Sequence, residues 1–187
     1  MQEPLLTPHP VGFLTRCLRA AFRLVREIML TIVPAAILSL FVNVYIAQAT
    51  VVDGPSMQPN LYTDYRVMTE KVSYRLHIPR RGDMVVVDRP DGEIPLIKRV
   101  VALPGEIVEV RKGHVYINNT PIREPWVTYW GGEDYPPLEV PVDHVFVLGD
   151  NRANSKDSRE IGPVSLDLVS RHVIIIFWPL DKIKLMP

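Results

Sequence analysis

Residues 107–117 have the sequence IVEVRKGHVYI, in which two short runs rich in Val and Ile flank a polar centre. Such runs are typical of β-strands, whose successive side chains point to opposite faces. Their close spacing predicts a hairpin in which Ile107–Val110 pairs with Val115–Ile117 through residues 111–114.

The same kind of run recurs along the chain on both sides of this hairpin. Further strands are expected at residues 65–72, 84–88, 96–103, 145–148 and 172–178, with Gly and Pro between them. Eighteen prolines in 187 residues disfavour long helices here. The sequence therefore predicts one all-β domain over residues 53–187, with a smaller hairpin-containing subregion at about 106–145.

A long apolar run precedes this domain. No charged residue lies between Glu27 and Asp53, and a bilayer core needs roughly 20 helical residues. We expect a transmembrane helix over residues 28–52. One alternative is a buried core helix. Another is a cleaved signal peptide, although its apolar region would span only about 7 to 15 residues.

The flanks of this run predict its orientation. Basic residues gather before it and are few after it, which favours a cytoplasmic N-terminus. The protein is then expected in the plasma membrane, with a single span and residues 53–187 outside the cytoplasm. Residues 1–27 form the cytoplasmic segment and could lie along the anionic leaflet as an amphipathic helix; the alternative is a plain extension of the span. The amphipathic pattern sets Arg16, Arg19, Arg23 and Arg26 opposite Phe13, Leu14, Leu18, Ala21, Phe22 and Val25.

Composition excludes several classes of function. The chain has 21 basic and 21 acidic residues, so nothing indicates a nucleic-acid partner. Its five histidines are scattered and Cys17 is its single cysteine. The pattern therefore predicts no metal, no cofactor and no intramolecular disulfide.

Ser56 is a candidate nucleophile. It follows the apolar run within the rigid segment Gly54-Pro55-Ser56-Met57-Gln58-Pro59, which would hold it at a membrane surface. The segment lacks the second glycine of a Gly-x-Ser-x-Gly elbow, so a base has to come from elsewhere in the chain.

Lys98 is the best candidate for that base. In a strand it shares a face with Leu96 and Val100, and burial on an apolar face lowers the pKa of a lysine from its usual value of about 10.4. The alternative is a lysine whose stem lies on the sheet while its amine reaches water. Residues 149–159, GDNRANSKDSR, are densely polar directly after an apolar strand, although a solvated turn also explains this composition.

Four blocks in order resemble the bacterial type I signal peptidases, also called leader peptidases. They are residues 56–61 (SMQPNL), 81–86 (RGDMVV), 97–106 (IKRVVALPGE) and 149–159. The resemblance covers the span and nearly all of the outer domain. It implies a β fold of mostly antiparallel sheets and a membrane-bound serine endopeptidase that removes signal peptides from preproteins.

The resemblance also implies roles for individual residues. Ser56 would be the nucleophile, with its backbone N–H as an oxyanion donor, and Lys98 the general base that completes a Ser-Lys dyad. Ser155 would orient the Lys98 amine, supported by an Asp157–Arg159 ion pair. Shallow pockets for the small residues of an Ala-x-Ala exit would be lined by Val52, Met57, Leu61 and Ile97. For these four, core packing is the alternative.

Other features depart from the pattern or remain open. Gly54 stands where some members carry a hydroxyl for the oxyanion, Leu96 where Tyr is frequent, Asn60 where Thr is common and Ala153 where a polar residue is usual. An aromatic face of Trp126, Tyr129 and Trp130 could enter the headgroup region or pack in the core. Two other classes share features with this chain: a self-cleaving repressor-type serine–lysine protein and a catalytically silent, membrane-anchored binding domain.

Overall fold

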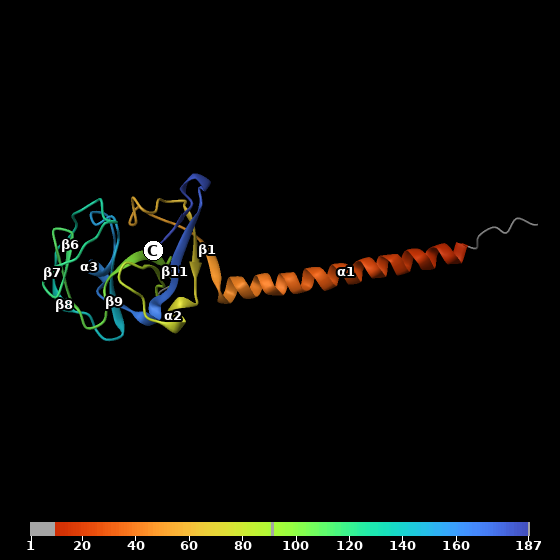
Figure 1. Ribbon diagram of the computed structural model, residues 1–187, viewed down its shortest axis with the longest axis horizontal. Coiled ribbons are helices and arrows are strands. Elements are labelled where there is room, and N and C mark those ends of the chain that lie inside the picture. The colour runs from red at the N-terminus through yellow and green to blue at the C-terminus, as the bar shows by residue number, and fades with distance from the viewer. Residues whose placement is uncertain (1–9, 91, 187) are drawn as a thin grey trace, which may run out of the picture. The chain divides into compact units, whose positions relative to one another are not determined.

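The computed structural model describes residues 10–90 and 92–186, without the side chains of residues 10–14. Residues 1–9 of the expected cytoplasmic segment, and the side chains of Phe13 and Leu14, therefore lie outside the description. The described chain divides into two compact units between Val44 and Tyr45. The first unit is a helix and the second is a β domain (Figure 1).

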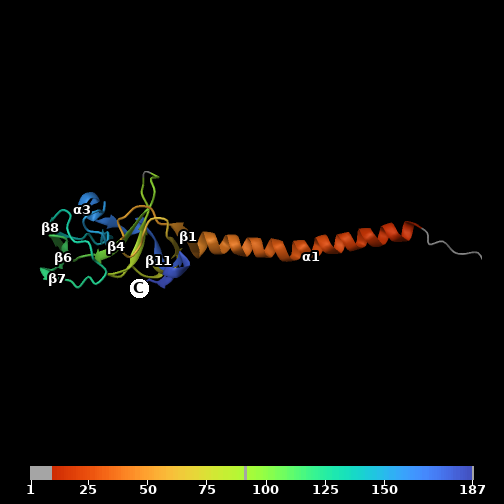
Figure 2. The same cartoon turned by 90° about the horizontal axis from the view of Figure 1, so that it is seen from above.

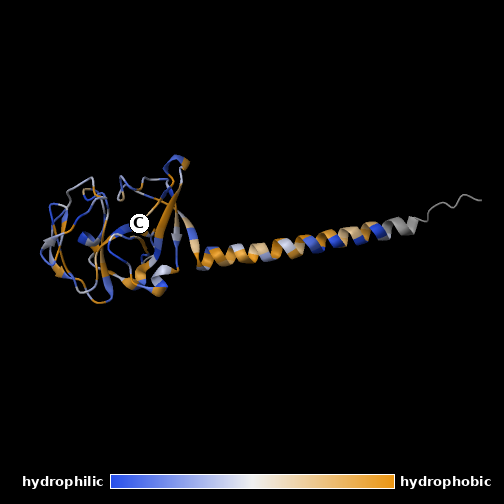
Figure 3. Ribbon diagram, viewed as in Figure 1, coloured by the Kyte–Doolittle hydropathy of each residue, from blue (hydrophilic) through white to orange (hydrophobic). Residues whose placement is uncertain are grey.

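The first unit consists of α1, Pro10–Tyr45, which contains Pro34. Residues 15–45 are long and apolar enough to cross a bilayer. Apolar residues dominate the half of α1 nearer Tyr45, whereas polar residues interrupt the other half (Figure 3). This division follows from the arginines before Glu27 and the uncharged run after it.

The β domain begins at once after α1. Its helices and strands are, in chain order, β1 Ala47–Val51, β2 Arg66–Glu70, α2 Ser73–Leu76, β3 Met84–Val87, β4 Leu96–Ala102, β5 Ile107–Arg111, β6 His114–Ile117, β7 Thr120–Pro121, β8 Tyr135–Glu139, β9 His144–Leu148, α3 Ser158–Ile161, β10 Val164–Ser165, η1 Leu166–Leu168, β11 Val169–Trp178, η2 Leu180–Lys182 and β12 Lys184–Leu185.

The strands form two antiparallel sheets. The larger has the order β1-β2-β11-β3-β4-β9-β10, with β12 paired to β11, and the smaller has the order β7-β6-β5-β8. Within the β domain, the small sheet lies at the end away from β1 in both views (Figures 1 and 2). The predicted all-β class with mostly antiparallel sheets and one N-terminal apolar helix is confirmed.

Period-two patterning explains how the two sheets share a core. On β3, Met84 and Val86 enter one buried cluster while Val85 and Val87 enter another, so this strand is buried on both faces. On β9, Phe146 contributes to a third cluster, which it shares with inward residues of β5 and β6. Continuous apolar runs such as MVVV thus mark strands covered on both sides.

The predicted hairpin is confirmed in detail. β5 pairs with β6 in a register that places Arg111 opposite His114. Lys112 and Gly113 form the turn between them, with positive φ of 51° and 82°. Two positive φ values are what a tight two-residue hairpin turn requires, and glycine adopts them without strain.

The expected helix over residues 28–52 needs a correction at its end. α1 stops at Tyr45, and Ala47–Val51 pair with β2 as the edge strand of the large sheet. The apolar run continues through this boundary, so hydropathy alone did not locate it. The reason for the change is that β-branched Thr50 and Val51 favour extended backbone, and β2 supplies hydrogen-bond partners for it.

Candidate active site

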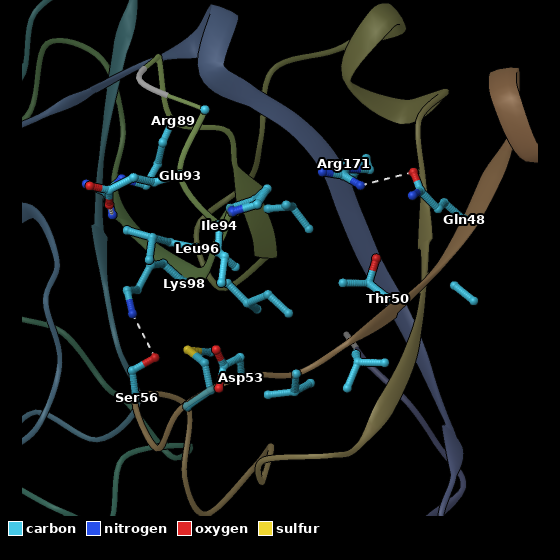
Figure 4. Close-up of a pocket in the computed structure, with 18 residues that line it drawn as sticks. Gln48, Thr50, Asp53, Ser56, Arg89, Glu93, Ile94, Leu96, Lys98 and Arg171 are labelled. Atoms are coloured by element: carbon cyan, nitrogen blue, oxygen red, sulfur yellow. Dashed lines mark hydrogen bonds and ion pairs between the residues drawn. The ribbon is translucent and has the colours of Figure 1, made fainter.

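The structure brings Ser56 and Lys98 together. Lys98 Nζ lies 2.7 Å from Ser56 Oγ, although the residues are 42 positions apart in the chain. Lys98 is held by the central strand β4, whereas Ser56 sits on the loop between β1 and β2 (Figure 4). The pair is thus formed by a rigid strand and a constrained turn.

Lys98 is almost completely buried, with 2% of its surface exposed. Burial lowers its pKa from 10.5 to about 8, because a desolvated ammonium is disfavoured. The Asp157 and Asp150 carboxylates raise the pKa and the Arg159 guanidinium lowers it, but burial is the largest influence. A neutral amine can accept a proton from the neighbouring hydroxyl, which an ammonium cannot.

The backbone around Ser56 is fixed by the segment that follows β9. The Asn151 N–H donates to the Ser56 carbonyl at 3.0 Å, and the Asn151 amide side chain donates to the Pro55 carbonyl at 3.3 Å. At Gly149 the two segments approach so closely that a Cβ there would lie 2.5 Å from the Ser56 carbonyl oxygen. The dense polar block at residues 149–159 therefore holds the Ser56 turn in place.

Asp157 and Arg159 form a buried ion pair. Two bonds of 2.9 Å join the guanidinium to the carboxylate, and Asp157 also accepts the Gly149 N–H at 3.0 Å. The same carboxylate receives the Arg159 N–H and so caps α3. This pair ties α3 to the end of β9, just behind Gly149.

Ser155 lies next to this pair. Its Oγ is buried and has no protein hydrogen-bond partner among the residues described. The hydroxyl lies against Gly149, because a Cβ at that position would meet Ser155 Oγ at 2.2 Å. The expected bond from Ser155 to the Lys98 amine is not recorded in the structure and stays a prediction.

A second buried ion pair was not found by the sequence analysis. Arg99 binds Asp150 with two bonds of 2.7 and 2.6 Å, and its Nη1 donates to the Gly82 carbonyl at 2.7 Å. Asn60 donates to the same carboxylate at 2.8 Å. These four residues join the nucleophile loop, the turn before β3, β4 and the polar block. One of them lies in each of the four quoted sequence blocks, which was the available signal.

A third buried pair connects the site with the small sheet. Arg152 binds Glu124 through both terminal nitrogens, and it donates to the carbonyls of Gly149 at 3.0 Å and Gly113 at 2.6 Å. Glu124 was also missed, because its position in a loop carries no periodic pattern.

The three aromatic residues singled out earlier separate in the structure. The Arg99 guanidinium carbon lies over Trp126, 4.7 Å from the centre of the indole ring. The Trp130 ring instead stacks on the His114 ring, with the two ring centres 4.1 Å apart. Trp130 and Tyr129 are partly exposed. Trp126 thus packs against a buried ion pair, as the core-packing alternative expected.

A cleft of about 720 Å³ opens beside Ser56 and Lys98 (Figure 4). It runs along β1 and is bounded by the first residues of β4. Val52, Met57 and Ile97, three of the four expected pocket residues, line it. Leu61 does not line it; it is fully buried in the cluster that also contains Val52 and Met57.

The cleft also contains charged residues that the sequence analysis did not assign. They are Asp53, Arg89, Glu93 and Arg171, the last of which bonds Gln48 at the end of the cleft away from Ser56. Among the described residues, no group of three His, Cys, Asp or Glu side chains is placed to hold a metal ion.

Residues 25–178 match the sequence profile of the family described as signal peptidase, peptidase S26. The chain belongs to this family. The resemblance carried by the four sequence blocks is therefore confirmed, and the chain is a peptidase of the kind that cleaves signal peptides.

Named relatives agree with this assignment. The probable signal peptidase I-2 of Synechocystis sp. is 36% identical over 86% of this chain and 76% of its own length. The signal peptidase I of Leptolyngbya laminosa is 35% identical over 82% and 79%. A crystal structure of a signal peptidase I from Enterococcus faecalis V583 aligns with 52% of this chain and 97% of its own, at 32% identity and a TM-score of 0.44. The assignment rests on the sequence matches.

Proposed function

We propose that this signal peptidase is a membrane-bound serine endopeptidase that uses Ser56 and Lys98 as a catalytic dyad and cleaves after small residues of the Ala-x-Ala type. The observation that carries the proposal is the 2.7 Å separation between Lys98 Nζ and Ser56 Oγ at a buried lysine. A nucleophile within hydrogen-bond reach of a desolvated base is the arrangement that nucleophilic catalysis requires.

The reaction follows from these two groups. The neutral Lys98 amine takes the Ser56 proton while Oγ attacks the scissile carbonyl carbon, giving a tetrahedral oxyanion. The Lys98 ammonium then protonates the leaving amine, and the C–N bond breaks to leave an acyl-Ser56 ester. Lys98, neutral again, activates a water that hydrolyses the ester and regenerates Ser56.

The Ser56 backbone N–H is the proposed donor to the oxyanion. The Ser56 carbonyl is bonded by Asn151, which fixes the orientation of the turn that carries this N–H. Gly54 has no hydroxyl to add, so a second donor has to come from backbone or from another group. The Asp157–Arg159 pair and Ser155 are proposed to support the site from behind Gly149.

Two open strand edges support a mode of substrate binding. Among the described residues, β1 pairs only with β2. β9 pairs with β4 at residues 99–102, so residues 96–98 have no described partner on that side. An extended peptide can add between two such edges by main-chain hydrogen bonds. Val52, Met57 and Ile97 would then form the shallow apolar floor near Ser56, which suits Ala better than larger side chains.

α1 supports membrane attachment. Residues 15–45 are sufficient in length and apolar composition for one span. With the basic flank before this span, we propose that the N-terminus is cytoplasmic and that the β domain faces outward from the plasma membrane, where it meets signal-peptide-bearing preproteins.

The test is cleavage of a synthetic preprotein with an Ala-x-Ala exit by the detergent-solubilised full chain. Wild type should cut after the exit, and Ser56→Ala and Lys98→Ala should lose at least about a thousandfold in kcat/KM. Ser165→Ala and Lys182→Ala are matched controls outside the cleft and should retain activity.

Three outcomes would contradict the proposal. Full activity in either dyad variant would remove that residue from the mechanism. A wild type that is inactive on several such preproteins would favour the silent binding domain. Cleavage of the chain itself, without cleavage of an added preprotein, would favour the self-cleaving class.

A further inference from the structure

We propose that Arg171 is a specificity-determining residue at the far end of the cleft, where it disfavours Lys or Arg in the substrate upstream of the small residues and accepts polar or acidic side chains. This inference rests on the proposed function and concerns the same cleft. Its basis is the position, anchoring and charge of one side chain.

Arg171 is fixed where the cleft ends. It comes from β11, and its guanidinium donates to the Gln48 side-chain oxygen at 3.1 Å, to Asp88 at 3.0 Å and to Ser170 Oγ at 3.2 Å. Its side chain is 13% exposed and lines the cleft. Figure 4 shows the Arg171–Gln48 bond and the Lys98–Ser56 bond at opposite ends of the lining, with Thr50 and Ile94 between them.

Chain connectivity indicates which part of a substrate reaches this end. Gln48 is three residues after Tyr45, where the apolar helix ends, so it lies within about 11 Å of that end. The apolar segment of a signal peptide is embedded in the same bilayer as α1. The residues upstream of the scissile bond therefore extend from Ser56 toward Gln48 and Arg171, and the mature part leaves in the other direction.

The spacing of β1 sets the register. An extended chain rises about 3.3 Å per residue, so Gln48 lies about 13 Å from Val52. If the small residues of the exit sit beside Val52, the side chain that meets Arg171 belongs to about the fifth to seventh residue before the scissile bond.

The chemistry of the guanidinium then defines the preference. The three recorded bonds use one N–H on each nitrogen, and a guanidinium carries two more that can donate to a substrate carbonyl, hydroxyl, amide or carboxylate. A substrate Lys or Arg offers no acceptor and adds charge repulsion. Asp88 offsets part of the Arg171 charge, but it is half exposed and does not line the cleft.

The other charges of the cleft leave this preference intact. Arg89 and Glu93 form an ion pair with each other on the opposite wall, so together they add little net charge. Asp53 lies near Ser56, on the loop that carries it, and not beside Gln48. Arg171 is the cation that a peptide meets at the upstream end.

The experiment compares matched preproteins that share one Ala-x-Ala exit. They carry Ser or Lys at the fifth, sixth or seventh residue before the scissile bond, about where the register places Arg171. The quantity measured is the ratio of kcat/KM for the Ser and Lys substrates with full-length wild type, Arg171→Gln, Arg171→Lys and the exposed control Arg75→Gln. Wild type should prefer Ser by about three- to tenfold at one of these positions.

The variants separate charge from a structural effect. Arg171→Gln should bring the ratio close to one, whereas Arg171→Lys and Arg75→Gln should keep it. In wild type the preference should weaken as salt is raised from about 0.05 to 0.5 M, because mobile ions screen the repulsion. If Arg171→Gln fails to fold, the salt dependence of the wild-type preference still tests whether charge repulsion causes it.

An unchanged ratio in folded Arg171→Gln, or a wild-type preference that is absent or insensitive to salt, would overturn the inference while leaving the peptidase itself established. A wild type that cleaves none of the substrates would overturn the proposed function and this inference with it.

Discussion

The amine of Lys98 sits in an environment that few lysines occupy, and the pH dependence of activity should report it. Burial lowers its pKa to about 8, so below that pH most of the enzyme carries an ammonium that cannot accept the Ser56 proton. We expect kcat/KM to rise tenfold per pH unit below pH 8 and to level off above it. A profile from pH 5 to 10.5 on one preprotein measures this limb. A limb centred near 10 would mean that Lys98 is not desolvated in the free enzyme.

The same burial makes Lys98 costly for the stability of the fold. The pKa is about 8 in the folded chain against an ordinary 10.5, so between these values the folded state binds fewer protons and its stability rises with pH. At pH 7, which is below both pKa values, the full free-energy cost of burying the charged amine applies. Lys98→Met should therefore be more stable than wild type by about 3 kcal/mol at pH 7, with a smaller advantage at pH 10.

Thermal unfolding in detergent measures this difference, and the expected gain in Tm is about 6 to 12 °C at pH 7. Lys182→Met serves as the control, because that lysine is largely exposed. A loss of stability in Lys98→Met, or a gain independent of pH, would show that burial does not lower the pKa of Lys98.

Residues differ in how far sequence predicts their place in the site. Ser56 and Lys98 were predictable because a rigid turn and an alternating strand restrict where their side chains point. Arg171 was not, because its neighbours come from separate strands or their ends. The role of Ser155 came from the resemblance alone and stays a prediction, because a loop sets no register for its side chain. The contacts of such residues arise only when distant segments meet.

At the scale of elements, the end of β9 is the most constrained part of the site. Gly149 is in close contact with the Ser155 side chain and the Ser56 backbone. A Cβ at this position would lie 2.2 Å from Ser155 Oγ and 2.5 Å from the Ser56 carbonyl oxygen. Gly149→Ala therefore has to displace the Ser56 carbonyl, and with it the turn that holds Ser56 Oγ beside Lys98. We expect at least about a hundredfold loss in kcat/KM, since small displacements of reacting groups are costly, and destabilisation of about 1 to 3 kcal/mol.

Gly105→Ala is the comparison for this variant. Gly105 has φ of +77° with open space around it, so alanine there adds backbone strain of about 1 kcal/mol without a clash. Its Tm should fall while its kcat/KM stays near wild type. Equal activity in the Gly149 and Gly105 variants would show that the polar block does not position Ser56.

Strands with alternating or continuous apolar patterns were predicted well, and the others were missed for physical reasons. β2, β3, β4, β5, β6, β9 and most of β11 fall where expected, because burial on one or both faces requires apolar residues at regular positions in the sequence. β8 contains Pro136 and Pro137, which argue against a strand, yet at the edge of the small sheet they need not donate to a neighbour. β1 was not predicted as a strand, because its residues continue the apolar run of α1 and hydropathy does not separate the two.

At the scale of the whole molecule, the chain combines an apolar helix with a β domain that begins within two residues of it. If α1 spans the bilayer, as proposed, a tether this short keeps Ser56 near the membrane surface, since the chain from Tyr45 to Ser56 spans at most about 40 Å. Such a tether serves a substrate that is itself anchored by an apolar segment, because both reactants then share one surface.

This arrangement predicts opposite exposure of the two ends of α1. Cys17 is the only cysteine and is exposed on α1, so a membrane-impermeant maleimide reports its side of the membrane directly. With a cytoplasmic N-terminus, Cys17 should react in inside-out vesicles and not in intact cells or right-side-out vesicles. In a Cys17→Ser background, Val142→Cys, at a position 78% exposed in the β domain, should show the reverse. Reaction of both cysteines from the same side would mean that α1 does not cross the bilayer, and the inverse of the expected pattern would place the β domain in the cytoplasm. The inverse pattern, or reaction of both cysteines from the cytoplasmic side, would separate Ser56 from exported preproteins, because their exits emerge on the outer surface.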